Sequence, residues 1–206
     1  MKTWLQSLAA LTMSLVVSHA GAQSPTVPAA SGQTVTAIFA GGCFWCVEAD
    51  FDKVPGVLSA ESGYTGGKTA NPTYQTVSAG GTGHTEAVRL TYDPRVVSYP
   101  VLLDFFWHHI DPTVKDRQFC DVGDQYRSAI YYNSPAQKTV IEASKAAILK
   151  SGVLQEIHTE IAPESTFYPA EDYHQDYYNK NPLRYKYYRL TCGRDSRVAE
   201  VWGIGR

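Results

Sequence analysis

The sequence has no long hydrophobic run, no run of like charge and few cysteines. Its mostly apolar stretch from Leu8 to Val17 is far shorter than the roughly 20 apolar residues that span a bilayer. The net charge of −2 is spread along the chain, which argues against a nucleic-acid partner or a membrane surface. Four cysteines in 206 residues are too few for a disulfide scaffold, so each is interpreted separately. We expect no nucleic-acid binding, no stable membrane association and a monomer.

Methionine is also scarce, because Met1 and Met13 are the only two. Both lie in an N-terminal stretch that combines a positive charge, an apolar run and small residues near Ala20, which is typical of a secretory signal peptide. We predict that residues 1–22 are removed on export to a periplasm, with secretion as the alternative. The small and polar residues 23–33 are predicted to form a disordered leader.

Residues 34–206 are predicted to form a single domain. Its expected elements follow from apolar periodicity, caps and turn residues. In order they are a strand over 33–40, a helix over 44–54, strands over 57–67 and 84–94, a helix over 98–111, a strand over 125–132 and a helix over 134–150. Residues 68–83 are predicted to be a surface loop, and a long irregular segment with one short helix is expected after Gly152. This order predicts an α+β two-layer sandwich, with a ferredoxin-like core and a mixed sheet covered by helices.

The segment "GGCFWCVE" holds the cysteine with the most distinctive setting, Cys43. It follows a predicted strand and two glycines and opens a predicted helix, whose N-terminus favours a thiolate. Phe44 and Trp45 are suited to wall an apolar pocket, and Cys46 lies one helical turn away, within reach of a disulfide. A zinc site lacks its second pair of ligands, so we predict no metal. A thioredoxin-like oxidoreductase also uses a C-x-x-C pair after a strand, and this alternative stays open on the segment alone.

Further motifs follow in the order "SGYTGG", "GHTEAV", "DVGDQYRSAIYY" and "FYPAEDYHQDY". With "GGCFWCVE" they resemble the A-type peptide-methionine sulfoxide reductases, over the chain from about Thr34 to Trp202. The resemblance implies thiol-dependent reduction of methionine S-sulfoxide in proteins or peptides, with no bound cofactor. It implies that Cys43 is the nucleophile and that Phe44 and Trp45 receive the S-methyl group of the substrate.

The same resemblance implies four polar partners. Glu86 matches the carboxylic acid that assists the sulfoxide oxygen, Tyr64 and Tyr126 match two tyrosines that hydrogen-bond that oxygen, and Asp121 matches an acidic residue that supports the site. A sulfoxide is a poor electrophile until its oxygen is protonated or strongly hydrogen-bonded, so an acid and two phenols suit this reaction. An apolar pocket is expected to raise the pKa of Glu86 and keep it protonated.

The implied cycle needs a second cysteine and an external reductant. Attack by Cys43 leaves a cysteine sulfenic acid, which condenses with another thiol to a disulfide, and a thioredoxin-like dithiol then reduces that disulfide. We predict that Cys46 is the resolving cysteine because it needs no long-range movement, with Cys192 as the alternative. A relay or a structural pair of Cys120 with Cys192 also remains open.

Two other classes of protein remain in view. An exported thiol-disulfide oxidoreductase would use the same C-x-x-C pair and would leave methionine sulfoxide untouched. A secreted binding module would carry no cysteine of raised thiolate reactivity.

Overall fold

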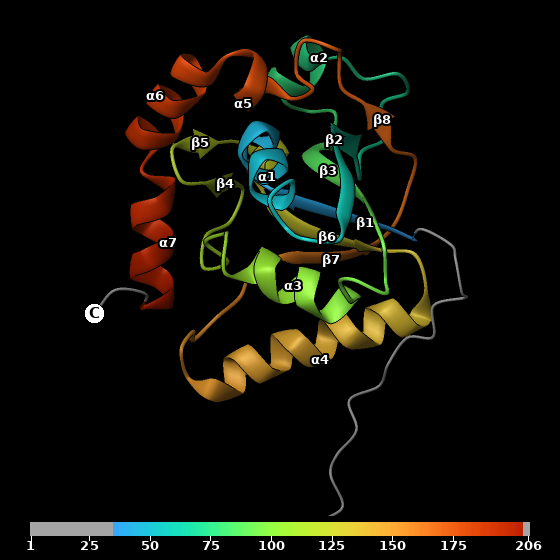
Figure 1. Ribbon diagram of the computed structural model, residues 1–206, viewed down its shortest axis with the longest axis vertical. Coiled ribbons are helices and arrows are strands. Elements are labelled where there is room, and N and C mark those ends of the chain that lie inside the picture. Colours follow the sequence, from blue (N-terminus) through green and yellow to red (C-terminus); the bar gives the residue numbers. More distant parts are fainter. Residues whose placement is uncertain (1–34, 204–206) are drawn as a thin grey trace, which may run out of the picture.

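The computed structural model describes residues 35–203 (Figure 1). The predicted signal peptide and leader lie outside the described residues, as do the first two residues of the strand expected over 33–40. Within residues 35–203 no helix is long and apolar enough to cross a membrane.

Six strands form one mixed sheet. Their spatial order is β7 (Glu160–Pro163), β6 (Ser128–Tyr132), β1 (Val35–Gly41), β3 (Thr85–Tyr92), β2 (Val57–Thr65) and β8 (Tyr168–Pro169). The four central strands pair antiparallel, and β7 joins β6 in parallel. With α1 (Phe44–Phe51) after β1 and α3 (Tyr99–Trp107) after β3, they form the βαββαβ unit of a ferredoxin-like fold. The predicted α+β class and ferredoxin-like core are confirmed.

The main core lies where α1 and α3 meet the sheet. Phe39 of β1 is fully buried there. Its ring stacks on Phe51 of α1 at 5.3 Å and on Phe106 of α3 at 4.9 Å between centroids. Because side chains alternate along a strand, Ile38 and Ala40 point to the other face, where a smaller cluster forms with Tyr131. The β-branched and aromatic residues of β1 therefore serve two faces at once.

Helix α4 (Pro135–Ser151) lies against α3, at the lower edge of Figure 1. The Ser134 side chain caps its first turn, Pro135 follows, and Gly152 ends it with a φ of +77°. These are the residues that start and stop helices. The Trp107 indole N–H donates to Ser144 Oγ of α4 at 3.0 Å, which links the two helices.

The prediction of an irregular C-terminal segment is wrong in part. The segment contains α5 (Tyr177–Lys180), α6 (Pro182–Cys192) and α7 (Arg194–Trp202), which run along one side of the molecule in Figure 1. Helix α6 has no buried residue. A helix that buries no face needs no apolar stripe of helical period in its sequence, so periodicity does not reveal it. Gly193, with a φ of +71°, separates α6 from α7.

Two smaller features complete the surroundings of the site. The predicted loop over 68–83 contains the short helix α2 (Tyr74–Ser78), which a capping box of Thr73 and Thr76 begins. A small hairpin of β4 (Arg117–Gln118) and β5 (Asp121–Val122) is followed by the 3₁₀ helix η1 (Asp124–Tyr126). Both features bring polar side chains toward the start of α1.

Candidate active site

The turn between β1 and α1 places Cys43 at the N-terminus of a helix. Gly42 has a φ of +85°, a conformation that L side chains rarely adopt. A Cβ at Gly42 would lie 2.6 Å from Cβ of Gln118, so the turn also has no room for a side chain. Cys43 occupies the N-cap position, and α1 starts at Phe44. The predicted strand, glycine turn and helix start are confirmed.

Eight residues from six elements or their borders line a small pocket of about 60 Å³ in front of this turn. They are Cys43, Phe44, Trp45, Tyr74, Glu86, Asp121, Tyr126 and Tyr188. This volume holds only a few water molecules, so the pocket suits a small terminal group rather than a ring. Six of the predicted site residues line it, whereas Tyr64, Cys46 and the alternative resolving residue Cys192 do not.

Glu86 joins the sheet to the start of α1. Its side chain is 3% exposed, and Oε2 accepts a hydrogen bond from the Phe44 amide at 3.0 Å. Burial raises the pKa of Glu86 to about 8, with the Phe44 amide opposing and the charge of Asp121 adding to the rise. Glu86 is therefore a neutral carboxylic acid at pH 7, as the sequence predicts, and Oε1 is left to carry the proton.

The two cysteines of α1 are both buried free thiols. Burial raises the pKa of Cys43, and a hydrogen bond to Cys46 and the nearby carboxyls of Glu86 and Asp121 add to the rise. The hydrogen bond from Cys43 in turn lowers the pKa of Cys46, with help from Arg194 and Arg189. This direction is opposite to the one that the helix N-terminus favours, because burial is the largest cause of the shift. A raised pKa favours the thiol form of Cys43 in the resting site.

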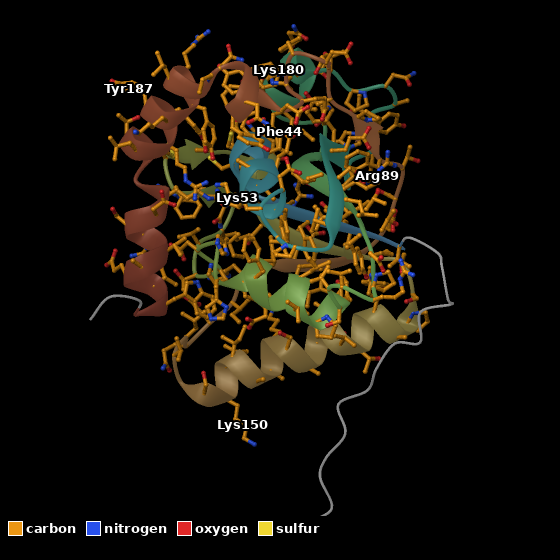
Figure 2. The ribbon with its side chains drawn as sticks, viewed as in Figure 1. Phe44, Lys53, Arg89, Lys150, Lys180 and Tyr187 are labelled. Atoms are coloured by element: carbon orange, nitrogen blue, oxygen red, sulfur yellow. A yellow bond between two sulfur atoms is a disulfide. The ribbon has the colours of Figure 1, made fainter. Side chains whose placement is uncertain are left out.

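The indole of Trp45 is held by the C-terminal part of the chain. It stacks on the ring of Tyr177 at 3.7 Å with an interplanar angle of 6°, and its N–H donates to Nδ1 of His174 at 3.0 Å. The His174 ring also lies 5.0 Å from that of Phe44. Figure 2 shows Phe44 near the centre of the view, inside the molecule. Two residues that the sequence analysis did not select, His174 and Tyr177, therefore position the aromatic wall.

The structure brings Tyr74, in place of Tyr64, to the pocket. Tyr64 of β2 lies directly opposite Glu86 of β3 in the sheet register, but its ring is fully buried against Phe44. Its hydroxyl donates to Oε2 of Glu171 at 2.9 Å, away from the lining. Tyr74 comes from the segment predicted to be a surface loop, and no motif marked it.

Asp121 and Tyr188 form a pair at the edge of the pocket. The Tyr188 hydroxyl donates to Oδ2 of Asp121 at 2.5 Å. Burial raises the pKa of Asp121, while this hydrogen bond and the charge of Arg194 oppose the rise. Tyr188 also packs edge-on against Trp45 at 5.9 Å. The sequence analysis missed Tyr188 because α6 was expected to be irregular.

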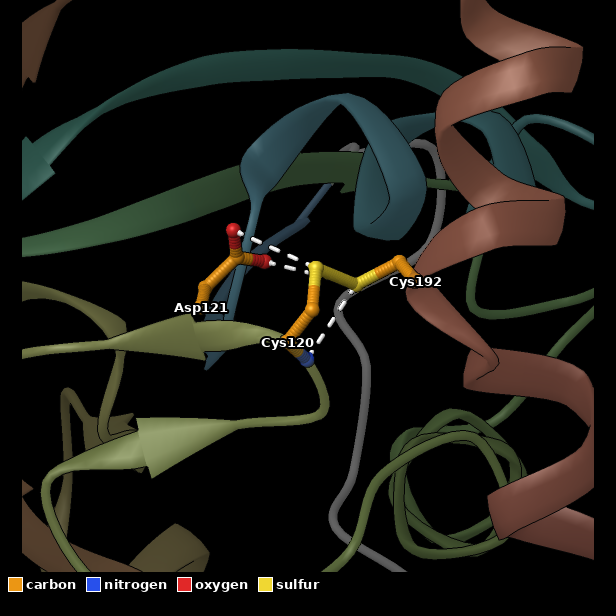
Figure 3. A group of neighbouring side chains, drawn as sticks. All are labelled: Cys120, Asp121 and Cys192. Carbon is orange, nitrogen blue, oxygen red and sulfur yellow. Dashed lines mark hydrogen bonds between the residues drawn. A yellow bond between two sulfur atoms is a disulfide. The ribbon is translucent and has the colours of Figure 1, made fainter.

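The other two cysteines are joined. Cys120 and Cys192 form a disulfide across 72 residues of sequence, with Cα atoms 5.0 Å apart (Figure 3). The sequence left open whether Cys120 and Cys192 form a structural pair or a relay. The structure shows that the two are bonded to each other, while Cys43 and Cys46 are both free thiols.

Two groups of side chains have the spacing of metal ligands within residues 35–203. The first is Cys120, Asp121 and Cys192, whose sulfurs are joined and so offer no thiolate. In the second, Glu48 accepts hydrogen bonds from the Ser62 hydroxyl and the Asp176 amide, and Asp52 accepts one from Tyr178. Protein donors account for both acids, and the absence of a metal from the reaction stays a prediction.

Comparison with known proteins places this pocket in a family. The peptide methionine sulfoxide reductase family matches residues 35–204. The MsrA 2 protein of Caulobacter vibrioides is 50% identical over 186 residues, which are 89% of this chain and 92% of the relative. The MsrA/MsrB protein of Vibrio cholerae is 46% identical over 203 residues, 98% of this chain, and the chain spans about half (53%) of that relative.

Solved structures agree with the sequence relatives. Methionine sulfoxide reductase A of Corynebacterium diphtheriae superposes with a TM-score of 0.67 at 39% identity, over 74% of this chain and 78% of that one. Mxr1 of Saccharomyces cerevisiae in complex with Trx2 shares the fold, with a TM-score of 0.51 at 22% identity over 74% and 90% of the two chains.

The fold and the pocket define a thiol-based oxidoreductase, in which a buried cysteine at a helix start faces a neutral carboxylic acid. The chain belongs to the peptide methionine sulfoxide reductase family, in the A type for which its relatives are named. The predicted family membership is confirmed.

Replacing Glu86 by glutamine removes the ionisable carboxyl and keeps an oxygen that can accept from the Phe44 amide. The folded pKa of Glu86, about 8, lies above the ordinary value of 4.5 for a glutamate. The contribution of protonated Glu86 to stability is therefore complete below the pKa of Glu86 in the unfolded chain. It is lost as the pH rises through the pKa of Glu86 in the folded protein. Between about pH 5 and about pH 9, we expect the unfolding free energy of wild type to fall by a few kcal/mol relative to Glu86→Gln.

Urea denaturation at several pH values measures this difference. Glu142→Gln, at an exposed position of α4, is the control and should follow wild type at every pH. Parallel pH profiles for wild type and Glu86→Gln would contradict a buried neutral acid.

Proposed function

We propose that this protein reduces the S epimer of methionine sulfoxide in proteins and peptides, with Cys43 as nucleophile and Glu86 as acid. The main support is that the neutral carboxylic acid of Glu86 and the thiol of Cys43 share one small pocket, which Tyr74 and Tyr126 also line. Burial raises the pKa of both tyrosines, so they remain hydrogen-bond donors at any physiological pH. Three donors can thus converge on one oxygen.

In the first step the substrate methyl group lies against Phe44 and Trp45. Glu86 protonates the sulfoxide oxygen, which makes the sulfur electrophilic, and the Cys43 sulfur attacks as its own proton departs. The sulfur–sulfur bond made by this attack and the sulfur–oxygen bond of the substrate then break as the oxygen, which keeps its proton, moves to the Cys43 sulfur and the Cys43 proton returns to Glu86. Methionine is released, and the oxygen ends on Cys43 as a sulfenic acid, so two electrons pass from Cys43 to the substrate.

In the second step the Cys46 thiol condenses with the sulfenic acid of Cys43, and one water leaves. Cys46 suits this role because it lies one turn along α1 and has a lowered pKa, caused first by the hydrogen bond from Cys43. The alternative resolver, Cys192, is already bonded to Cys120.

A thioredoxin-like dithiol then reduces the Cys43–Cys46 disulfide and is itself oxidised to a disulfide. Mxr1 of Saccharomyces cerevisiae, which has been solved in complex with Trx2, supports a reductant of this kind. We propose no bound cofactor.

The chain is proposed to act after export, on oxidised exported proteins. The support is the N-terminal sequence, with its apolar run and small residues before position 23.

Replacing Cys43 by serine should abolish turnover of methionine sulfoxide with dithiothreitol, because serine cannot accept the oxygen. From a racemic substrate the wild-type protein should leave the R epimer unreacted. One equivalent of substrate should produce a Cys43–Cys46 disulfide by mass spectrometry. Full activity in Cys43→Ser, or insulin reduction without sulfoxide reduction, would favour a thiol-disulfide oxidoreductase.

The tyrosines offer a second test. We expect Tyr74→Phe and Tyr126→Phe each to lower kcat about tenfold or more, because each removes a donor to the developing charge. Tyr64→Phe is the matched control and should keep kcat near wild type, since its hydroxyl donates to Glu171. Equal losses at Tyr64 and Tyr74 would contradict this assignment.

Export has its own measurement. When the full chain is produced with its own N-terminus in a Gram-negative host, N-terminal sequencing of the periplasmic protein should give a start at residue 21 or 23. A cytoplasmic protein that retains Met1 would contradict the proposal.

A further inference from the structure

Helix α6 forms part of the pocket without being part of the core. It contributes Tyr188 to the lining, yet none of its residues is buried. Its outward side chains Leu183, Tyr187 and Leu190 are 84%, 72% and 76% exposed, and Figure 2 shows Tyr187 pointing away from the molecule. Because hydrophobic burial does not hold this helix, its position depends on a few specific contacts.

Apart from the edge-on packing of Tyr188 against Trp45, the main contacts are polar or covalent. Arg189 of α6 pairs with Asp50 of α1 at 2.8 Å, and the Tyr188 hydroxyl donates to Asp121. The third contact is the disulfide, in which Cys192 is the last residue of α6 and Cys120 directly precedes Asp121. Cys192 lies four residues after Tyr188 and so on the same face of α6, and Cys120 is the chain neighbour of Asp121. The disulfide therefore joins the two segments that carry the Tyr188–Asp121 pair.

The distances around the disulfide are short (Figure 3). Sγ of Cys192 lies 4.0 Å from Oδ2 of Asp121 and 4.0 Å from the Tyr188 hydroxyl. Sγ of Cys120 lies 3.8 Å from Oδ1 of Asp121, and the Cys120 amide donates to Sγ of Cys192 at 3.2 Å. A disulfide carries no S–H, so these sulfurs pack against the pair and leave Tyr188 as its donor.

We propose that the Cys120–Cys192 disulfide is a positioning element of the pocket, which holds Tyr188 against Asp121 and α6 over Trp45, and that it takes no part in electron transfer. The inference rests on the proposed function of the pocket. Its second half is supported by the state of the four cysteines: the outer pair is closed while Cys43 and Cys46 are both free. The two cysteines proposed for the reaction are thus both thiols while the outer disulfide is intact.

The pair acts on the acid of the reaction. Burial raises the pKa of Asp121, and the hydrogen bond from Tyr188 opposes that rise and favours the ionised form. The charge of Asp121 in turn raises the pKa of Glu86. The titratable groups that face Glu86 from the surrounding elements are Cys43, Cys46, Tyr64, Tyr74, Asp121 and Tyr126. Tyr188 of α6 contacts two of these groups, because its hydroxyl donates to Asp121 and also lies beside Cys43. Burial is the main cause of the raised pKa of Glu86, so release of α6, which admits water to the pocket, lowers that pKa.

The test compares wild type with Cys120→Ser/Cys192→Ser, in which neither sulfur remains. We expect KM for a methionine-sulfoxide peptide to rise about tenfold, because the α6 wall is no longer fixed. The alkaline limb of the kcat/KM profile should move to lower pH. Tyr188→Phe, which keeps the disulfide, should shift the same limb in the same direction, and combining it with the double substitution should add little.

Tyr187→Ala, at an exposed position of the same helix, is the matched control and should keep the wild-type KM and pH profile. If the double variant does not fold, Tyr188→Phe alone must show the shifted limb. A double variant that loses only its melting temperature, with KM and pH profile unchanged, would overturn the proposal.

A relay would give another result. A double variant with a normal first turnover that a thioredoxin-like protein can no longer regenerate would assign the outer pair to electron transfer and refute its exclusion from the cycle. Loss of the first turnover in Cys43→Ser concerns the proposed function only, so the two failures are distinguishable.

Discussion

The hydrogen bond from the Phe44 amide to Glu86 is the contact on which the rest of the site depends. It joins β3 to the first turn of α1 across 42 residues, and it satisfies an amide that has no partner within its own helix. The same contact holds the carboxyl beside Cys43 in a buried place, where its pKa rises to about 8. This interaction thereby fixes the position of the acid, while burial raises its pKa against the opposing effect of the amide.

A buried arginine keeps the helix start in place from the other side. Arg194, at the beginning of α7, is 2% exposed and donates to the carbonyl oxygens of Gly41 and His109. Its Nε lies 3.7 Å from Oδ2 of Asp50. A buried charge is stable only with such partners, so the C-terminal helices, the glycine turn and α1 form one unit around the cysteines.

Local chemistry made much of this predictable. Gly41 and Gly42 between a β-branched strand and an amphipathic segment identify the turn, and the turn identifies Cys43. Glu86 follows from its motif together with the expectation that burial neutralises a carboxyl. Tyr64 shows where such reasoning ends, because its motif matches but its hydroxyl extends past the pocket to Glu171. The raised pKa of Cys43 runs against the local expectation for a related reason: the helix N-terminus is local, whereas the opposing burial and carboxyls are not.

The sequence by itself determined the family, the order of strands and helices in the ferredoxin-like core, and the cysteine proposed to carry the chemistry. These follow from periodicity, caps and short motifs, which act over a few residues. Only the tertiary structure decided that Tyr74 and Tyr188 line the pocket, that His174 and Tyr177 hold Trp45, and that Cys120 pairs with Cys192. Those contacts join segments far apart in the chain and from helices without an apolar stripe, so no local pattern records them.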